Sequence, residues 1–107
     1  MFPEAIMNLA QASIPLSGCT AHMIQGENEQ VLFMTFEEDV ELPEHVHDAQ
    51  WGIVLSGKIE MTIGGEKKEY TKGENFYIPK GIRHSGKIYA GYSDITYFNQ
   101  KDRYKKK

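Results

Sequence analysis

Residues 73–84 of this 107-residue chain read GENFYIPKGIRH, and this stretch decides the fold. Gly73 is followed six residues later by Pro79, two residues later by Gly81 and three residues later by His84. In a chain of this composition, roughly one sequence in a thousand would contain that spacing by chance. The stretch is therefore a motif rather than a coincidence, and the other patterns in the sequence are interpreted around it.

The rest of the chain consists of short strand-like runs between turn residues. Residues 58–63 alternate between polar and apolar side chains, which is typical of a strand with one face in water. Gly64 and Gly65 then predict a two-residue hairpin turn, because both can take positive φ at little steric cost. Further strands are expected at residues 31–36, 51–55, 66–70, 76–78, 87–89 and 94–98.

Helix is expected only within residues 3–12. Seven or so short strands at regular spacing predict an all-β domain, either a β-sandwich or a β-barrel.

A second group of candidate functional residues lies before residues 51–55. His45 and His47 form a His-x-His pair in an extended segment, where alternate side chains project from the same face. Both imidazoles can therefore point at one ion, although most such pairs in proteins bind nothing. Gln50 follows three residues after His47, and Gly57 follows seven residues after Gln50.

Together these residues resemble the two motifs of the cupin family. The second motif, Gly-x5-Pro-x-Gly-x2-His-x3-Asn, is matched in residues 73–84 and fails only where Ile88 replaces its Asn. The first motif, Gly-x5-His-x-His-x3-4-Glu-x6-Gly, is matched at both histidines and at Gly57. Asp39 stands in place of its first Gly, and Gln50 in place of its Glu. The resemblance implies a double-stranded β-helix, the jelly-roll barrel of the cupins.

The resemblance also implies that His45, His47, Gln50 and His84 converge on one divalent transition metal inside the barrel. Three neutral imidazoles suit Zn, Ni, Fe, Mn or Cu alike. Because Gln is neutral where the family has Glu, the ion would keep its full charge and would attract an anionic substrate more strongly. Alternatively, the shortened loop swings Gln50 away and leaves a site of three histidines.

A set of three histidines and one glutamine is similar to that of the small cupins of pectin breakdown, which open the ring of unsaturated galacturonate without redox chemistry. We therefore expect a metal-dependent isomerase or lyase acting on a small, oxygen-rich anion such as a sugar acid. Two alternatives stay open: a non-catalytic module that binds or senses a small ligand, and an iron-dependent dioxygenase. The sequence assigns no catalytic residue.

The substrate pocket is expected to draw on aromatic and Met side chains near the motifs and on one arginine that could clamp a carboxylate. These candidates are Met34, Phe36, Trp51, Tyr77, Tyr97 and Arg83. His22 lies outside both motifs and is expected to play no part.

Charge is divided unevenly along the chain. Residues 1–57 hold nine acids and neither Lys nor Arg, whereas residues 58–107 hold all twelve bases and six acids. The net charge of −3 argues against nucleic acid as the main partner, and no apolar run could span a bilayer. The single cysteine, Cys19, cannot form an internal disulfide, so a cytoplasmic protein is expected.

We expect residues 1–107 to form one cupin domain that assembles as a homodimer. Within it, residues 1–18 would be a short N-terminal segment. The basic tail at residues 101–107 is expected to be a solvated end.

Overall fold

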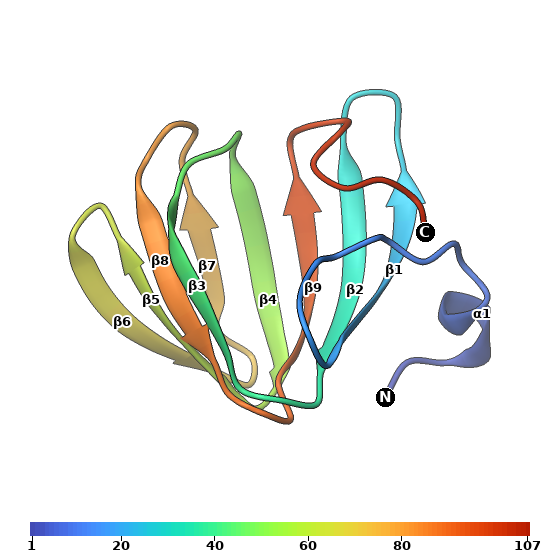
Figure 1. The fold of residues 1–107 in the computed structure, drawn as a ribbon, viewed down its shortest axis with the longest axis horizontal. Coiled ribbons are helices and arrows are strands. Elements are labelled where there is room, and N and C mark those ends of the chain that lie inside the picture. The colour runs from blue at the N-terminus through green and yellow to red at the C-terminus, as the bar shows by residue number, and fades with distance from the viewer.

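The computed structural model describes residues 1–107, which form one short helix and nine strands (Figure 1). The elements are α1 (Glu4–Met7), β1 (Cys19–Gln25), β2 (Gln30–Phe36), β3 (Val40–His45), β4 (Gln50–Ser56), β5 (Lys58–Ile63), β6 (Glu66–Thr71), β7 (Asn75–Ile78), β8 (His84–Ile88) and β9 (Ser93–Phe98). One antiparallel sheet has the order β1-β2-β9-β4-β7, and the other has the order β3-β8-β5-β6. The all-β jelly-roll prediction is confirmed.

Local sequence explains the β5–β6 hairpin. Gly64 and Gly65 have φ values of 57° and 84°, so the predicted turn with two positive φ angles is present. The turn sets the register that pairs Ile63 with Glu66. Along β5, Ile59 and Met61 are buried, as the alternating pattern predicts.

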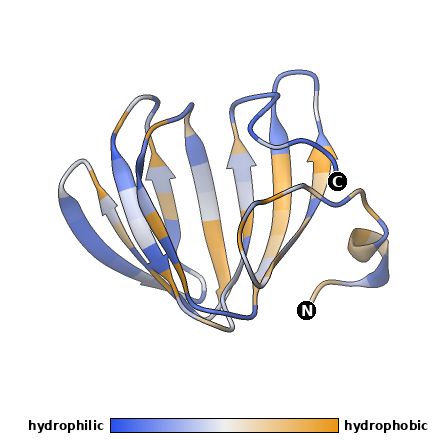
Figure 2. Cartoon of the chain, in the orientation of Figure 1, coloured by the Kyte–Doolittle hydropathy of each residue, from blue (hydrophilic) through white to orange (hydrophobic).

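The core lies between the two sheets and is built from the inward faces of the strands. In β2, for example, every second residue is buried, including Leu32, Met34 and Phe36. Figure 2 shows β2 largely in the hydrophobic colour and β6 almost entirely in the hydrophilic one. The buried hydrophobic residues are Ala12, Ala21, Met23, Leu32, Met34, Phe36, Val54, Ile59, Met61, Phe76, Ile78, Ile88, Tyr92 and Phe98.

Two features of the N-terminal half differ from the expectation. The helix is only the four residues of α1, because the chain further on pairs with β1: the Ala12 N–H donates to the Ala21 carbonyl (2.9 Å), and the Met23 N–H donates to the Ala10 carbonyl (2.8 Å). Strand β1 itself was not expected, since its sequence lacks a clear run of β-branched residues. Its pairing with β2, rather than local propensity, makes it a strand.

The basic tail is not a free solvated end. Gln30, which is fully buried, donates from Nε2 to the carbonyl oxygens of Lys101 and Tyr104 (3.1 and 2.7 Å). Its Oε1 accepts from the backbone N–H of Tyr104 (3.1 Å). A buried amide needs such partners, so it holds the tail against the barrel while the lysines of the tail stay exposed. In Figure 1 this segment folds back from the end of β9.

The only helix, α1, spans four residues, which is far shorter than a membrane crossing requires.

Candidate metal centre

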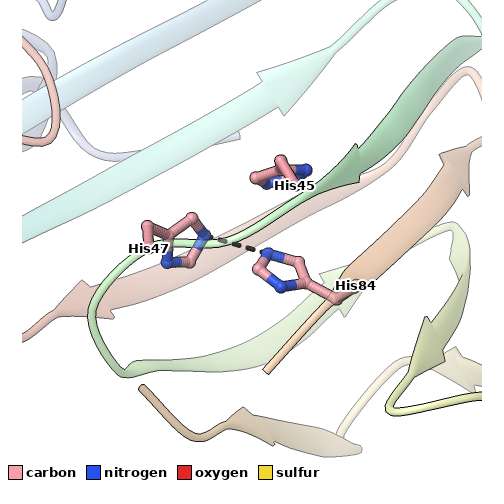
Figure 3. A group of neighbouring side chains, drawn as sticks. All are labelled: His45, His47 and His84. Carbon is pink, nitrogen blue, oxygen red and sulfur yellow. Dashed lines mark hydrogen bonds between the residues drawn. The ribbon is translucent and has the colours of Figure 1, made fainter. Parts of the chain in front are cut away.

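Three histidines meet at one end of the barrel (Figure 3). His45 ends β3, His84 begins β8, and the register of these neighbouring strands places the two residues opposite each other. His47 lies in the loop after β3 and points back towards both. One possible ligand atom from each of the three rings lies within 4.8 Å of those from the other two.

Backbone carbonyls fix the tautomer of each ring. The Nδ1 atoms of His45, His47 and His84 lie 2.8, 2.6 and 2.9 Å from carbonyl oxygens of Pro43, Asp48 and Ile82. A carbonyl only accepts, so each Nδ1 carries the hydrogen, and each Nε2 keeps a free lone pair. This is the arrangement in which histidines bind metal ions through Nε2.

The free lone pairs of two rings then face each other. The Nε2 atoms of His47 and His84 are 3.0 Å apart, the contact drawn in Figure 3. Two lone pairs at this distance repel unless a proton or a cation lies between them. Two nitrogens at about 2.1 Å from a common ion, at right angles, would be about 3 Å apart. The donor set and its spacing therefore fit a divalent transition metal.

Burial keeps the rings of His47 and His84 neutral. Burial lowers the pKa of His47 to about 4. The hydrogen bond to the Asp48 carbonyl partly offsets this fall, whereas the positive charge of nearby Arg103 adds to it. Burial also lowers the pKa of His84. Near neutral pH both rings are therefore unprotonated, as a metal ligand must be.

The histidines open onto a cavity of about 910 Å³ inside the barrel. That volume is at the large end for small-ligand sites. Met34 and Phe36 from β2 line it, as the sequence indicated. Gln50, the first residue of β4, also lines it and is half-buried. Its coordination of a metal stays a prediction.

Four other expected pocket residues lie elsewhere. Trp51, Tyr77 and Tyr97 point outwards from the five-stranded sheet and are 38%, 57% and 38% exposed, because their neighbours along each strand face inwards. Arg83 lies outside the cavity and its guanidinium donates to Glu44 at 2.8 Å. These four side chains therefore do not line the cavity.

The cavity has polar walls that sequence reasoning missed. Its lining includes Asp94 and Thr96 on β9 and Gln100 and Arg103 after it. The period-two pattern of β9 could have pointed to Asp94 and Thr96, which alternate with outward-facing residues. No local signal could have found Arg103, because its position depends on the docking of the tail.

Comparison with known proteins gives the same fold. The family model described as "Cupin domain" matches residues 32–89. Among curated proteins, a mannose-1-phosphate guanylyltransferase of Salmonella montevideo is 34% identical, with coverage of 71% of this chain and 20% of that protein. Mannose-1-phosphate guanylyltransferase 2 of Escherichia coli O157:H7 is 35% identical, with coverage of 76% of this chain and 20% of that protein. The chain thus spans about a fifth of the length of the curated relatives it matches.

Solved structures resemble the chain over most of its length. An RmlC-like cupin from Shewanella frigidimarina superposes with a TM-score of 0.74 at 21% identity, covering 88% of this chain and 86% of that one. KdgF from Halomonas sp. superposes with a TM-score of 0.71 at 18% identity, covering 85% of this chain and 87% of that one. An oxalate decarboxylase variant of Bacillus subtilis gives 0.72 at 19% identity, covering 90% of this chain and 28% of that one. At these identities the likeness concerns the fold.

Proposed function

This chain belongs to the cupin family, and on that premise we propose that it binds one divalent transition metal and, beside it, a small oxygen-rich anion such as a sugar acid. The observation that carries the proposal is the convergence of three Nε2 lone pairs at the edge of a large cavity. The ligands would be His45, His47 and His84, with Gln50 as the fourth. An ion bound there would supply Lewis acidity, which polarises a carboxylate or hydroxyl oxygen.

The anionic character of the ligand rests on Arg103. Its guanidinium carbon lies 4.5 Å from the centre of the Tyr104 ring and 5.8 Å from that of Phe98, which fixes the side chain in the cavity wall. Its Nε is buried without a hydrogen-bond partner. An arginine so placed can bind a carboxylate, the role that the sequence suggested for Arg83.

The reaction we favour is an isomerase or lyase step on a sugar acid. The resemblance of the ligand set to that of the small cupins of pectin breakdown supports this class. The non-catalytic binding module and the iron-dependent dioxygenase use the same cavity and differ in what happens after binding. Galacturonate and unsaturated uronates are incubated with the metal-loaded protein. Their turnover distinguishes an isomerase or lyase from a binding module, and oxygen uptake with ferrous iron identifies a dioxygenase.

Arg103→Gln is expected to weaken galacturonate binding to the metal-loaded protein by about 10-fold or more, because a hydrogen bond to a charged group is lost. Metal affinity should stay close to that of the wild type. Calorimetric titration measures both, with Lys101→Gln, an exposed cation of the same tail, as the control. A metal-loaded protein that binds no uronate, or binds it equally well after Arg103→Gln, would contradict the assignment.

We further propose a homodimer formed through the outer face of the five-stranded sheet. Residue register joins Tyr77, Trp51 and Tyr97 in one row across β7, β4 and β9. No Asp, Glu, Lys or Arg occupies the accessible outward positions of these three strands, which include Trp51, Ile53, Asn75, Tyr77, Ile95 and Tyr97. A second copy would therefore meet an apolar surface without repulsion between like charges.

Trp51→Lys is expected to give a monomer, because it places two like charges in the proposed interface. Sedimentation velocity measures the change. Thr62→Lys, on the charged outer face of the other sheet, is the control and should leave the assembly unchanged. A wild-type protein that sediments as a monomer at all concentrations would refute the dimer.

A single cupin domain over residues 1–107 and a cytoplasmic location complete the proposal. The location is supported by the lone Cys19, which has no second cysteine with which to form an internal disulfide.

A further inference from the structure

Buried polar atoms without partners are concentrated in the cavity. Five buried side-chain nitrogen or oxygen atoms in the protein have no hydrogen-bond partner. Four of them belong to residues that line the cavity: Asp94 Oδ1, Thr96 Oγ1, Gln100 Oε1 and Arg103 Nε. A buried polar group without a partner is costly, so such a cluster indicates a place that a polar ligand or water fills.

Asp94 and Thr96 are the most enclosed of these groups, at 4% and 0% exposure. They take successive inward positions of β9 and, together with Phe98, form one row along the strand. The Phe98 ring lies 5.6 Å from the ring of His47. Thr96 and Asp94 lie two and four residues before Phe98 on β9, so Thr96 is the nearer of the two to the histidines. The two groups thus lie deeper in the barrel than the histidines.

The surroundings leave one side of Asp94 free. Its Oδ2 accepts a 2.5 Å hydrogen bond from the Tyr92 hydroxyl, which holds the carboxyl in place. The Thr96 hydroxyl lies close enough to lower the pKa of this carboxyl, but it makes no hydrogen bond of normal length to Oδ1, which has no other partner. Its neighbours across the sheet, Met34 and Val54, are apolar. Opposite Thr96 on β4 stands Gly52, over which the apolar ring of Phe76 packs, so this side offers the Thr96 hydroxyl no polar partner.

We propose that Asp94 and Thr96 form a second recognition site, which binds a hydroxyl group of the same ligand whose carboxylate lies by the histidines and Arg103. A ligand hydroxyl both donates and accepts, so it can satisfy Asp94 Oδ1 and Thr96 Oγ1 together. The inference rests on the proposed function and narrows it: the ligand is a polyhydroxylated carboxylate, and a carboxylic acid of the same size without hydroxyl groups is a poor substitute.

Two six-membered-ring probes test this in the metal-loaded protein. Galacturonate carries a carboxylate and hydroxyl groups, whereas cyclohexanecarboxylate carries the carboxylate alone. Calorimetry should show that the wild type binds galacturonate at least about 10-fold more tightly than cyclohexanecarboxylate, since each hydrogen bond contributes a few-fold in affinity.

The variants Thr96→Val and Asp94→Asn should separate recognition from scaffolding. Thr96→Val preserves the shape of the side chain. It should weaken the binding of galacturonate by about 5-fold and leave the binding of cyclohexanecarboxylate unchanged. It should also leave the melting temperature of the ligand-free protein unchanged or higher, because a buried hydroxyl without a partner is removed. Asp94→Asn should likewise weaken the binding of galacturonate and leave that of cyclohexanecarboxylate unchanged. Thr62→Val, on the outer face of β5, is the matched control and should change neither affinity.

Equal affinity of the wild type for both probes would overturn the inference and leave the proposed function standing. The same holds if Thr96→Val and Asp94→Asn alter neither affinity, because water alone would then fill this end of the cavity. Binding of neither carboxylate would instead overturn the proposed function.

Discussion

His84→Ala is expected to reduce metal affinity by more than about 100-fold while the barrel stays folded. Loss of a group that merely orients a ligand costs 10- to 100-fold, so loss of the ligand itself should cost more. His84 contributes an Nε2 that faces the Nε2 of His47 at 3.0 Å. It lies outside the hydrophobic core cluster, so its removal spares the packing that holds the sheets together.

Metal titration with Zn and Ni, followed by circular dichroism of the metal-free protein, measures both parts of this expectation. His22→Gln changes the one histidine outside the cavity and should leave metal affinity unchanged. Gln50→Ala should reduce metal affinity less than His84→Ala does, because a neutral oxygen is a weaker ligand than imidazole. An unfolded His84→Ala protein, or one that binds metal as tightly as the wild type, would refute the role of His84 as a ligand.

Asp94→Asn is expected to stabilise the metal-free protein strongly above pH 7. Burial raises the pKa of Asp94 from 3.8 to about 7, although the hydroxyls of Tyr92 and Thr96 oppose the rise. The unfolded chain ionises above pH 4, whereas the folded protein resists ionisation until about pH 7. The contribution of Asp94 to stability is therefore greatest below pH 4 and is lost as the pH rises to 7. A pKa difference of about 3 corresponds to a loss of about 4 kcal/mol, which Asn avoids.

Urea unfolding at pH 5 and pH 8, in the presence of a chelator, gives the free energy of unfolding of both proteins. The gain of Asp94→Asn over the wild type should be larger at pH 8. The histidines titrate in both proteins, so their contribution cancels in this difference. A gain that is the same at both pH values would mean that Asp94 ionises as freely in the folded protein as in the unfolded chain.

The histidine cluster was predictable because its residues belong to two motifs with recognisable spacing. His45 and His47 project from one extended segment, and the paired strands β3 and β8 bring His84 opposite His45. The prediction for Trp51 had no such support. It is adjacent to Gln50, and in a strand a shift of one residue moves a side chain to the other face. Burial patterns of the neighbouring strands decide which face is inside, and these depend on the whole sheet.

Arg103 was beyond sequence reasoning for a different reason. The tail reads as a run of charged residues, which is typical of a solvated end. What holds it is the buried amide of Gln30, some seventy residues earlier, through hydrogen bonds to backbone atoms that any sequence possesses. Such a contact leaves no trace in residue types, so only the folded structure shows it.

The clamp made by Gln30 has a consequence for protein engineering. The Gln30 amide binds the backbone carbonyls of Lys101 and Tyr104. The side chains of residues 99–103 can therefore be randomised without removing these hydrogen bonds. The histidines belong to β3, the loop after it and β8, so a library confined to this short segment would leave them untouched. Selection from such a library for binding of neutral or cationic molecules would show how far this segment sets the charge preference proposed above.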